Sequence, residues 1–140
     1  MKKYSIYQLE NMANAVLLYL QEKQNKDIDI VRLANKIGFN VYQSYSLQSN
    51  SFKIKETSIF INATYKPDKQ RFLIAKAIAY IILNKNRSEF EINNFASMLL
   101  MPREKSVKTW QKHQRINSFA NAMKTSIDVA SIRLINLNLI

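Results

Sequence analysis

The sequence is defined first by what it lacks. It contains no cysteine, which excludes disulfides, thiolate metal ligands and cysteine nucleophiles and suits the cytoplasm. The one histidine, His113, lies in the polar run 111–115, where a metal would find no companion ligands, so we expect it to face solvent. With one glycine in the chain, a phosphate-binding glycine loop is absent. No stretch approaches the roughly 18 apolar residues of a membrane span, and the short apolar run 15–20 does not make a signal peptide. We therefore expect a cytoplasmic protein.

What is present indicates a folded, basic protein. A chain of 140 residues with 47% hydrophobic content is typical of one globular domain with a real core. The net charge of +11 favours nucleic acid, an acidic protein surface or an anionic lipid as partner. The basic residues are scattered, without a run of four, so a merely solvated surface explains them equally well.

The first half of the chain reads as two helices followed by three strands. A helical apolar pattern covers residues 5–24, and Asp27 or Asp29 can cap a second helix that ends at Gly38, the only glycine. Strand-forming residues occupy 41–45, 52–55 and 58–63, with a turn-like segment at 48–51. These patterns predict a small three-stranded sheet.

The stretch 70–102 organises the rest of the chain. Two helical patterns, joined by a short polar link at 84–88, predict an antiparallel helical hairpin. Pro67 favours the first turn of the first helix, and Pro102 ends the second. The inner faces carry Lys76, Tyr80 and Glu91, which are unusual residues for such positions.

This hairpin resembles that of the ImmA/IrrE-type zinc metallopeptidase family. The residues that carry the resemblance are Arg71, Phe72 and Ala75 in the first helix, and Glu91, Asn93, Phe95, Ala96, Leu99, Leu100, Met101 and Pro102 in and after the second. The resemblance extends more weakly from about residue 29 to the end of the chain. It implies a zincin-like fold in a single domain, 1–140.

The catalytic residues of the family motif are not present at the matching positions. Lys76 and Tyr80 stand where the resemblance implies two zinc-binding histidines, and Ala77 stands where it implies the general-base glutamate. Glu91 alone survives, in the third-ligand position. Zinc needs about three protein ligands, and a cation and a phenol are poor substitutes for imidazole. Without zinc the water keeps its high pKa, and alanine cannot accept its proton. The sequence therefore predicts a pseudo-peptidase, with no metal or other cofactor.

A second hypothesis concerns what replaced the metal. In an antiparallel hairpin Tyr80 lies level with Glu91, and the Lys76 side chain can reach the vacated position. We predict a Lys76–Glu91 ion pair assisted by the Tyr80 hydroxyl, because a carboxylate in an apolar pocket needs a partner. The alternative is that Lys76 extends to water and Glu91 faces solvent.

The third strand is a candidate for lining a groove that binds a partner. Its residues Ile59, Phe60, Ile61 and Asn62 match the resemblance, which implies a sheet beside the active helix and an edge strand that aligns a substrate chain by strand addition. This hypothesis requires a free edge on residues 58–63 near Tyr80. The alternative is a plain sheet that covers the helices.

The C-terminal part, 103–140, is basic, with seven Lys/Arg and two acids. It reads as helices, and the last two resemble the family's helix-turn-helix-like segment, with Ser126 as the cap of the final helix. Lys124, where a glycine is usual, and Arg133 are the candidate nucleic-acid contacts. The alternative is a structural role, and we expect any DNA binding to be weak and unspecific.

The fold expected is α+β, with a helical body, a small three-stranded sheet and a helical C-terminal segment. The resemblance implies a regulatory circuit of a phage or mobile element, so the leading hypothesis is a non-catalytic protein that binds a helix-turn-helix repressor. A DNA-binding regulator that uses the basic C-terminal segment is the alternative. An enzyme with a different metal arrangement is the third reading. No membrane partner is expected.

Overall fold

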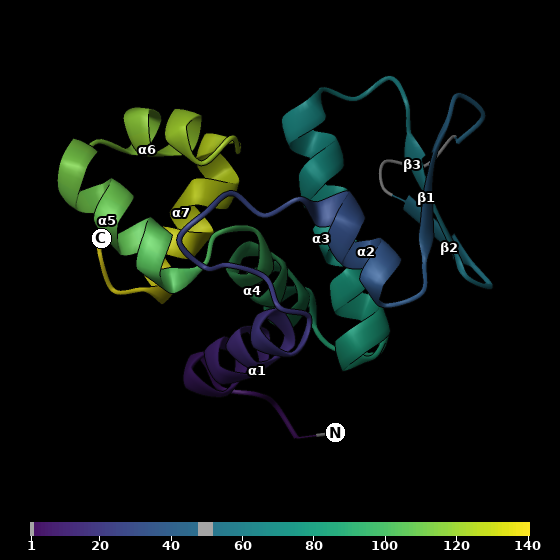
Figure 1. Ribbon diagram of the computed structural model, residues 1–140, viewed down its shortest axis with the longest axis horizontal. Helices are drawn as coiled ribbons and strands as arrows, with labels where there is room; N and C mark the ends of the chain where they lie inside the picture. Colours follow the sequence, from purple (N-terminus) through teal and green to yellow (C-terminus); the bar gives the residue numbers. More distant parts are fainter. Residues whose placement is uncertain (1, 48–51) are drawn as a thin grey trace.

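A computed structural model describes residues 2–47 and 52–140. Within these residues the chain forms seven helices and three strands (Figure 1). In chain order they are α1 (Ile6–Tyr19), α2 (Ile30–Lys36), β1 (Asn40–Ser44), β2 (Phe52–Lys55), β3 (Ser58–Asn62), α3 (Pro67–Leu83), α4 (Glu89–Leu100), α5 (Arg103–His113), α6 (Ile116–Ala122) and α7 (Ile127–Asn136). The predicted α+β class is confirmed. The turn predicted at 48–51 lies outside the described residues.

The pair α3 and α4 lies at the centre of the molecule. Helices α1 and α7 pack on α4, whereas α2 and the sheet pack on α3 (Figure 1). Ile78 of α3 and Phe95 and Leu99 of α4 are completely buried between these layers. The predicted hairpin is thus the element on which both halves of the fold are assembled.

Several predicted helix boundaries are confirmed by their caps. The Asp29 side chain accepts the N–H of Arg32 at the start of α2, and the Ser126 side chain accepts the N–H of Val129 at the start of α7. Gly38, with φ of 93°, takes the left-handed conformation that ends α2. These positions were predictable because each cap uses a residue type suited to it.

The first helix is shorter than the predicted 5–24. It ends at Tyr19 because Gln21 adopts a left-handed φ of 59° and the Glu22 N–H turns back to the Leu17 carbonyl at 2.8 Å. This hydrogen bond, together with that from the Gln21 N–H to the Leu18 carbonyl at 3.0 Å, closes the helix as a glycine cap would. No glycine marks this stop in the sequence.

The sheet has the strand order β1-β3-β2, with β3 parallel to β1 and antiparallel to β2. The prediction of a free edge on residues 58–63 is therefore wrong, because β3 is paired on both sides. Its burial alternates: Ile59 and Ile61 are fully buried against the helices, while Phe60 and Asn62 face the other way. The central strand β3 thus brings two buried isoleucines to the core, and β1 and β2 form the two edges of the sheet.

The buried apolar side chains form one continuous cluster that includes residues of α1, α2, β3, α3, α4, α6 and α7. In the described part of the chain, no helix has the length and apolar character needed to cross a membrane.

Candidate functional site

The positions that the sequence analysis singled out on α3 meet the first residue of α4. The Lys76 Nζ lies 3.1 Å from the Glu89 Oε2, and the Tyr80 hydroxyl donates to the Glu89 Oε1 at 2.6 Å. The Glu89 side chain is 64% exposed, whereas that of Lys76 is 17% exposed. We call Lys76, Tyr80 and Glu89 the hairpin triad.

The contacts of the triad change the acidity of Tyr80 and of Glu89. Burial, and then the hydrogen bond to Glu89, raises the pKa of Tyr80 to about 12, so its hydroxyl remains protonated and donating. The hydrogen bonds from Tyr80 and Lys76 lower the pKa of Glu89 below its ordinary value. The triad is therefore an ammonium, a neutral phenol and a carboxylate at neutral pH.

Aromatic rings enclose one side of the triad. The Phe52 ring of β2 lies 5.5 Å from the Tyr80 ring, centroid to centroid, and the Lys76 ammonium lies 6.0 Å from the Phe72 ring centroid. The edge strand β2, and not β3, is thus the strand that contacts Tyr80 through a ring.

The predicted ion pair between Lys76 and Glu91 is wrong, because Glu89 occupies that place. Residues two apart on a helix point about 200° apart, so Glu89 and Glu91 leave α4 on opposite sides. Glu91 instead lies under the N-terminal segment, where its Oε2 accepts the Tyr4 N–H at 2.9 Å and the Arg87 guanidinium at 3.2 Å. It is only 4% exposed, so the alternative in which it faces solvent is wrong as well.

Glu91 also closes the start of α4. Its Oε1 accepts the Ser88 N–H and hydroxyl, both at 3.1 Å, while the Ser88 Oγ accepts the Glu91 N–H. Burial raises the pKa of Glu91, but the bonds from Tyr4, Ser88 and Arg87 outweigh it and hold that pKa below its ordinary value. Serine followed three residues later by glutamate is a capping-box signal, and it could have identified this role from the sequence.

The residues at this site do not fit a zinc ion. Lys76 is a cation that can only donate, Tyr80 remains a neutral phenol, and both Glu91 oxygens are occupied on the far side of α4. Glu89 alone could serve as a ligand, whereas zinc takes about three. Ala77 is fully buried and carries no group that could accept a proton.

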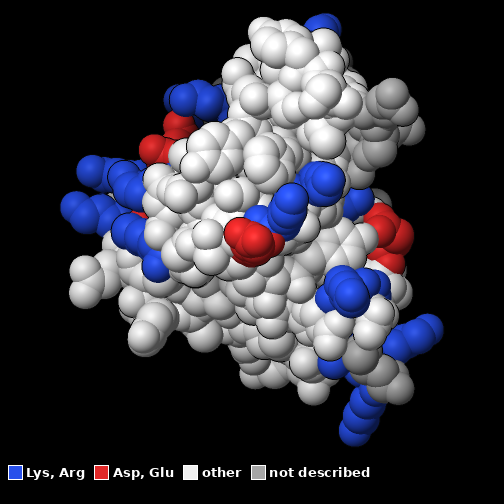
Figure 2. Space-filling view, turned by 90° about the vertical axis from the view of Figure 1, so that its right-hand side faces the viewer, with Lys and Arg blue, Asp and Glu red and all other residues white. Residues whose placement is uncertain are grey.

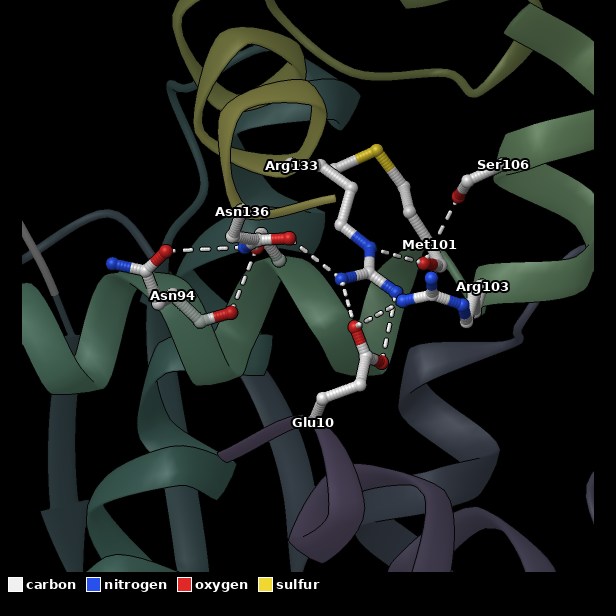
Figure 3. Close-up of polar contacts among 8 residues, drawn as sticks. Glu10, Asn94, Met101, Arg103, Ser106, Arg133 and Asn136 are labelled. Carbon is white, nitrogen blue, oxygen red and sulfur yellow. Dashed lines mark hydrogen bonds and ion pairs between the residues drawn. The ribbon is translucent and has the colours of Figure 1, made fainter. Parts of the chain in front are cut away.

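The other candidate site residue, Arg133, lies inside the protein (Figure 3). Its Nη1 and Nη2 bind the two Glu10 oxygens at 2.6 and 3.0 Å, and its Nε donates to the Met101 carbonyl at 2.7 Å. Nη1 also donates to Asn136 at 2.7 Å. Burial lowers the pKa of Arg133, and the hydrogen bond and charge of Glu10 act against that shift.

Arg133 is therefore not a nucleic-acid contact, and that prediction is wrong. Its side chain is 0% exposed and joins α7 to α1 and to the end of α4. The sequence held a signal, because Arg133 falls among the inward positions Val129, Ala130 and Leu134 of its helix. Lys124, by contrast, is exposed and lies 3.2 Å from Asp27, so the two predicted contacts do not share a surface.

Comparison with known proteins agrees with the fold described above. Residues 23–134 match the profile of the IrrE N-terminal-like domain, a peptidase family. No curated protein matches the chain significantly. Among solved structures, a Mycobacterium tuberculosis transcriptional regulator is similar, with a TM-score of 0.70 and 17% sequence identity, over 90% of this chain and 46% of that one.

The chain thus spans about half the length of that regulator, and at this identity the likeness concerns the fold alone. The family match extends from the segment before α2 into α7 and includes the whole α3–α4 hairpin. By this match the chain belongs to the IrrE N-terminal-like domain family.

Proposed function

We propose that this protein is a non-catalytic regulatory module that binds a helix-turn-helix repressor of a phage or mobile element without cleaving it. The observation that supports this most directly is the hairpin triad. Where a zinc peptidase needs metal ligands and a base, this chain has an ammonium, a neutral phenol and a carboxylate that satisfy one another. Three groups that bind one another in this way hold no metal ion, and without a metal no water molecule is activated for peptide hydrolysis.

The peptide-binding surface in this proposal is the outer edge of β2. In the described sheet β2 pairs only with β3, so alternate N–H and C=O groups of β2 point outward and can accept an added strand. The ring of Phe52, a residue of β2, packs against the ring of Tyr80 in the hairpin triad. An extended segment of the repressor would therefore lie beside the hairpin triad.

Burial of Arg133 removes the main support for the alternative, a DNA-binding regulator that uses the C-terminal segment. Glu10 neutralises the charge of Arg133, and Lys124 forms an ion pair with Asp27.

The test of partner binding is co-expression with a helix-turn-helix repressor from the same genome. We expect the two proteins to co-purify and the repressor to keep its intact mass. Successive residues of a strand send their N–H groups to opposite sides, so one of Lys53→Pro and Ile54→Pro blocks the outer edge of β2 without disturbing its pairing. That variant, recognised by an unchanged melting temperature, should lose the partner.

The matched control is the same pair of substitutions in β1, at Tyr42 and Gln43. The β1 edge lies two strands away from β2, so its folded proline variant should keep the partner. Cleavage of the repressor by the purified wild type, or one zinc per chain after purification without chelator, would overturn the non-catalytic proposal.

The position of a lost metal site can be tested separately. The double change Lys76→His and Tyr80→His provides two imidazoles one helical turn apart, facing Glu89. We expect this variant to bind zinc, measured by competition with a chromophoric chelator. A further Glu89→Gln change should weaken that binding more than Glu91→Gln does.

A further inference from the structure

The outer face of the sheet is a surface that the proposed function does not use. Helices α2 and α3 cover only one face, and the other points away from the body of the molecule (Figure 1). Figure 2 looks onto this side and shows a largely uncharged surface, with an acidic side chain next to basic ones near the middle of the view and further basic side chains toward its margins.

Aromatic rings occupy the centre of this face. Tyr42 of β1 is directly opposite Phe60 of β3, and their rings stack with centroids 5.6 Å apart and an interplanar angle of 27°. Tyr42 is 47% exposed, and Phe60 is half-buried. Both belong to the set of β residues that faces away from the core, since Val41, Ile59 and Ile61 pack inward.

The rows that cross this face add cations and small polar groups. Lys53 of β2 is paired with Phe60, so the central row reads Tyr42, Phe60, Lys53. The next row reads Asn40, Ser58, Lys55. Both lysines are exposed, and neither has a carboxylate within salt-bridge distance in the described structure. The one acid of β2, β3 and their turn is Glu56, in the turn itself.

We propose that this face binds single-stranded nucleic acid, with Tyr42 and Phe60 stacking on bases and Lys53 and Lys55 contacting phosphates. Aromatic rings on a sheet with cations beside them are what an unpaired strand needs, because every base has a π face and every nucleotide one negative charge. The overall charge of +11 attracts such a polymer.

A single strand fits this face better than a duplex. In a duplex the base faces are already stacked on one another and cannot reach Tyr42 or Phe60. An open sheet face is also too broad to enter the major groove of undistorted B-DNA, which admits one helix or a two-stranded ribbon. The Asn40 and Ser58 side chains lie in the row next to the rings and can bond to base edges.

The test uses fluorescence anisotropy with labelled 12-nucleotide oligo(dT) and oligo(U), and with a 20-base-pair duplex. We expect the single strands to bind more tightly than the duplex. Tyr42→Leu keeps the apolar bulk but removes the π face, and it should weaken binding about tenfold or more. Lys53→Gln with Lys55→Gln should reduce the slope of log affinity against log salt by about 1.4.

The matched control is Lys108→Gln with Lys112→Gln on α5, which lies at the opposite end of the molecule (Figure 1). This variant removes the same charge and should change the salt slope less than the β2 pair. Equal slopes for the two pairs, equal binding of Tyr42→Leu and wild type, preference for the duplex, or no binding at low salt would each overturn the proposal.

Heparin, a polyanion without bases, is a second probe. If heparin binds as tightly as the oligonucleotides and Tyr42→Leu has no effect on oligonucleotide binding, the surface binds anions without recognising bases, and the proposal is overturned. Repressor binding through β2 is measured independently, so either proposal can fail alone.

Discussion

Two ion pairs in this molecule use the same chemistry in opposite surroundings. Glu10 and Arg133 are enclosed between α1, α4 and α7, and the guanidinium is fully buried. Lys76 and Glu89 lie at the surface of the hairpin, and the carboxylate is mostly in water. Enclosure makes the first pair essential to the fold, because either charge alone would be stranded in a medium that solvates it poorly. Water replaces a lost partner in the second.

A third carboxylate, Glu91, lies between these extremes. It is as enclosed as Glu10, yet most of its bonds come from neutral groups, the N–H of Tyr4 and the N–H and hydroxyl of Ser88, with Arg87 as its one cation. The series predicts that the cost of removing a carboxylate follows how deeply the carboxylate and its cation are buried together, and not the number of its bonds. The following changes test that ordering.

The largest effect is expected at Glu10 and Arg133. Glu10→Ala or Arg133→Ala should lower the free energy of unfolding by about 3–5 kcal/mol. The first change leaves the buried guanidinium of Arg133 without its carboxylate, and the second leaves Glu10 with only Arg103, whose Nη1 lies 4.0 Å away. The double variant Glu10→Leu, Arg133→Met should lose clearly less than the sum of the two single changes. Urea unfolding followed by circular dichroism gives the three values. Additive losses would show that the two charges do not depend on each other.

Glu91→Ala should cost about 2 kcal/mol, since it removes the reciprocal cap of α4, leaves the Tyr4 N–H unpaired and takes the carboxylate away from Arg87, which keeps its hydrogen bond to the Lys2 carbonyl. The measurement is again urea unfolding. Glu91→Gln can keep one acceptor oxygen and should recover part of the loss. A loss as small as that of Glu89→Ala would mean that burial of Glu91 contributes nothing.

Both carboxylates of α4 should contribute to the pH dependence of stability. The pKa of each is held below its ordinary value of 4.5, so each contributes stability above that pH which is lost as pH falls through the lower folded-state pKa. Glu91→Gln and Glu89→Gln should each flatten the acid limb of the wild-type curve. The measurement is the melting temperature between pH 2 and 6; an unchanged limb in both variants would contradict the assignment.

The smallest effect is expected at the exposed end of the series. Glu89→Ala should cost less than about 1 kcal/mol, and the loss should shrink in high salt, because the pair with Lys76 is open to water and screened. Thermal unfolding at two salt concentrations provides the test. A loss that matches that of Glu10→Ala would show that the Lys76 ammonium depends on Glu89 as strongly as a buried charge would.

Much of the fold could be predicted because it is encoded locally. Asp29, Gly38 and Ser126 each mark a helix boundary with a side chain or a backbone conformation that few other residues supply. The end of α1 was not visible, because Gln21 adopts a left-handed conformation without being glycine. The sheet was predicted with its strands but not their order, since strand periodicity gives the buried face and says nothing of the neighbours.

The site was predicted in part. The sequence identified Lys76 and Tyr80 as facing a carboxylate of the second helix, but it named Glu91 instead of Glu89. Choosing between them requires the relative rotation of α3 and α4, which tertiary packing determines. Arg133 was misread because its partner, Glu10, is 123 residues away, and no local pattern connects them.

The ion pair between Glu10 and Arg133 also affects where this protein could be truncated. The family match begins at residue 23, after α1, and ends at residue 134, one residue past Arg133. A fragment cut at those limits would keep the guanidinium and discard the carboxylate that neutralises it. In this chain the segment that matches the family therefore depends on a helix outside it, because Glu10 of α1 neutralises the buried guanidinium of α7.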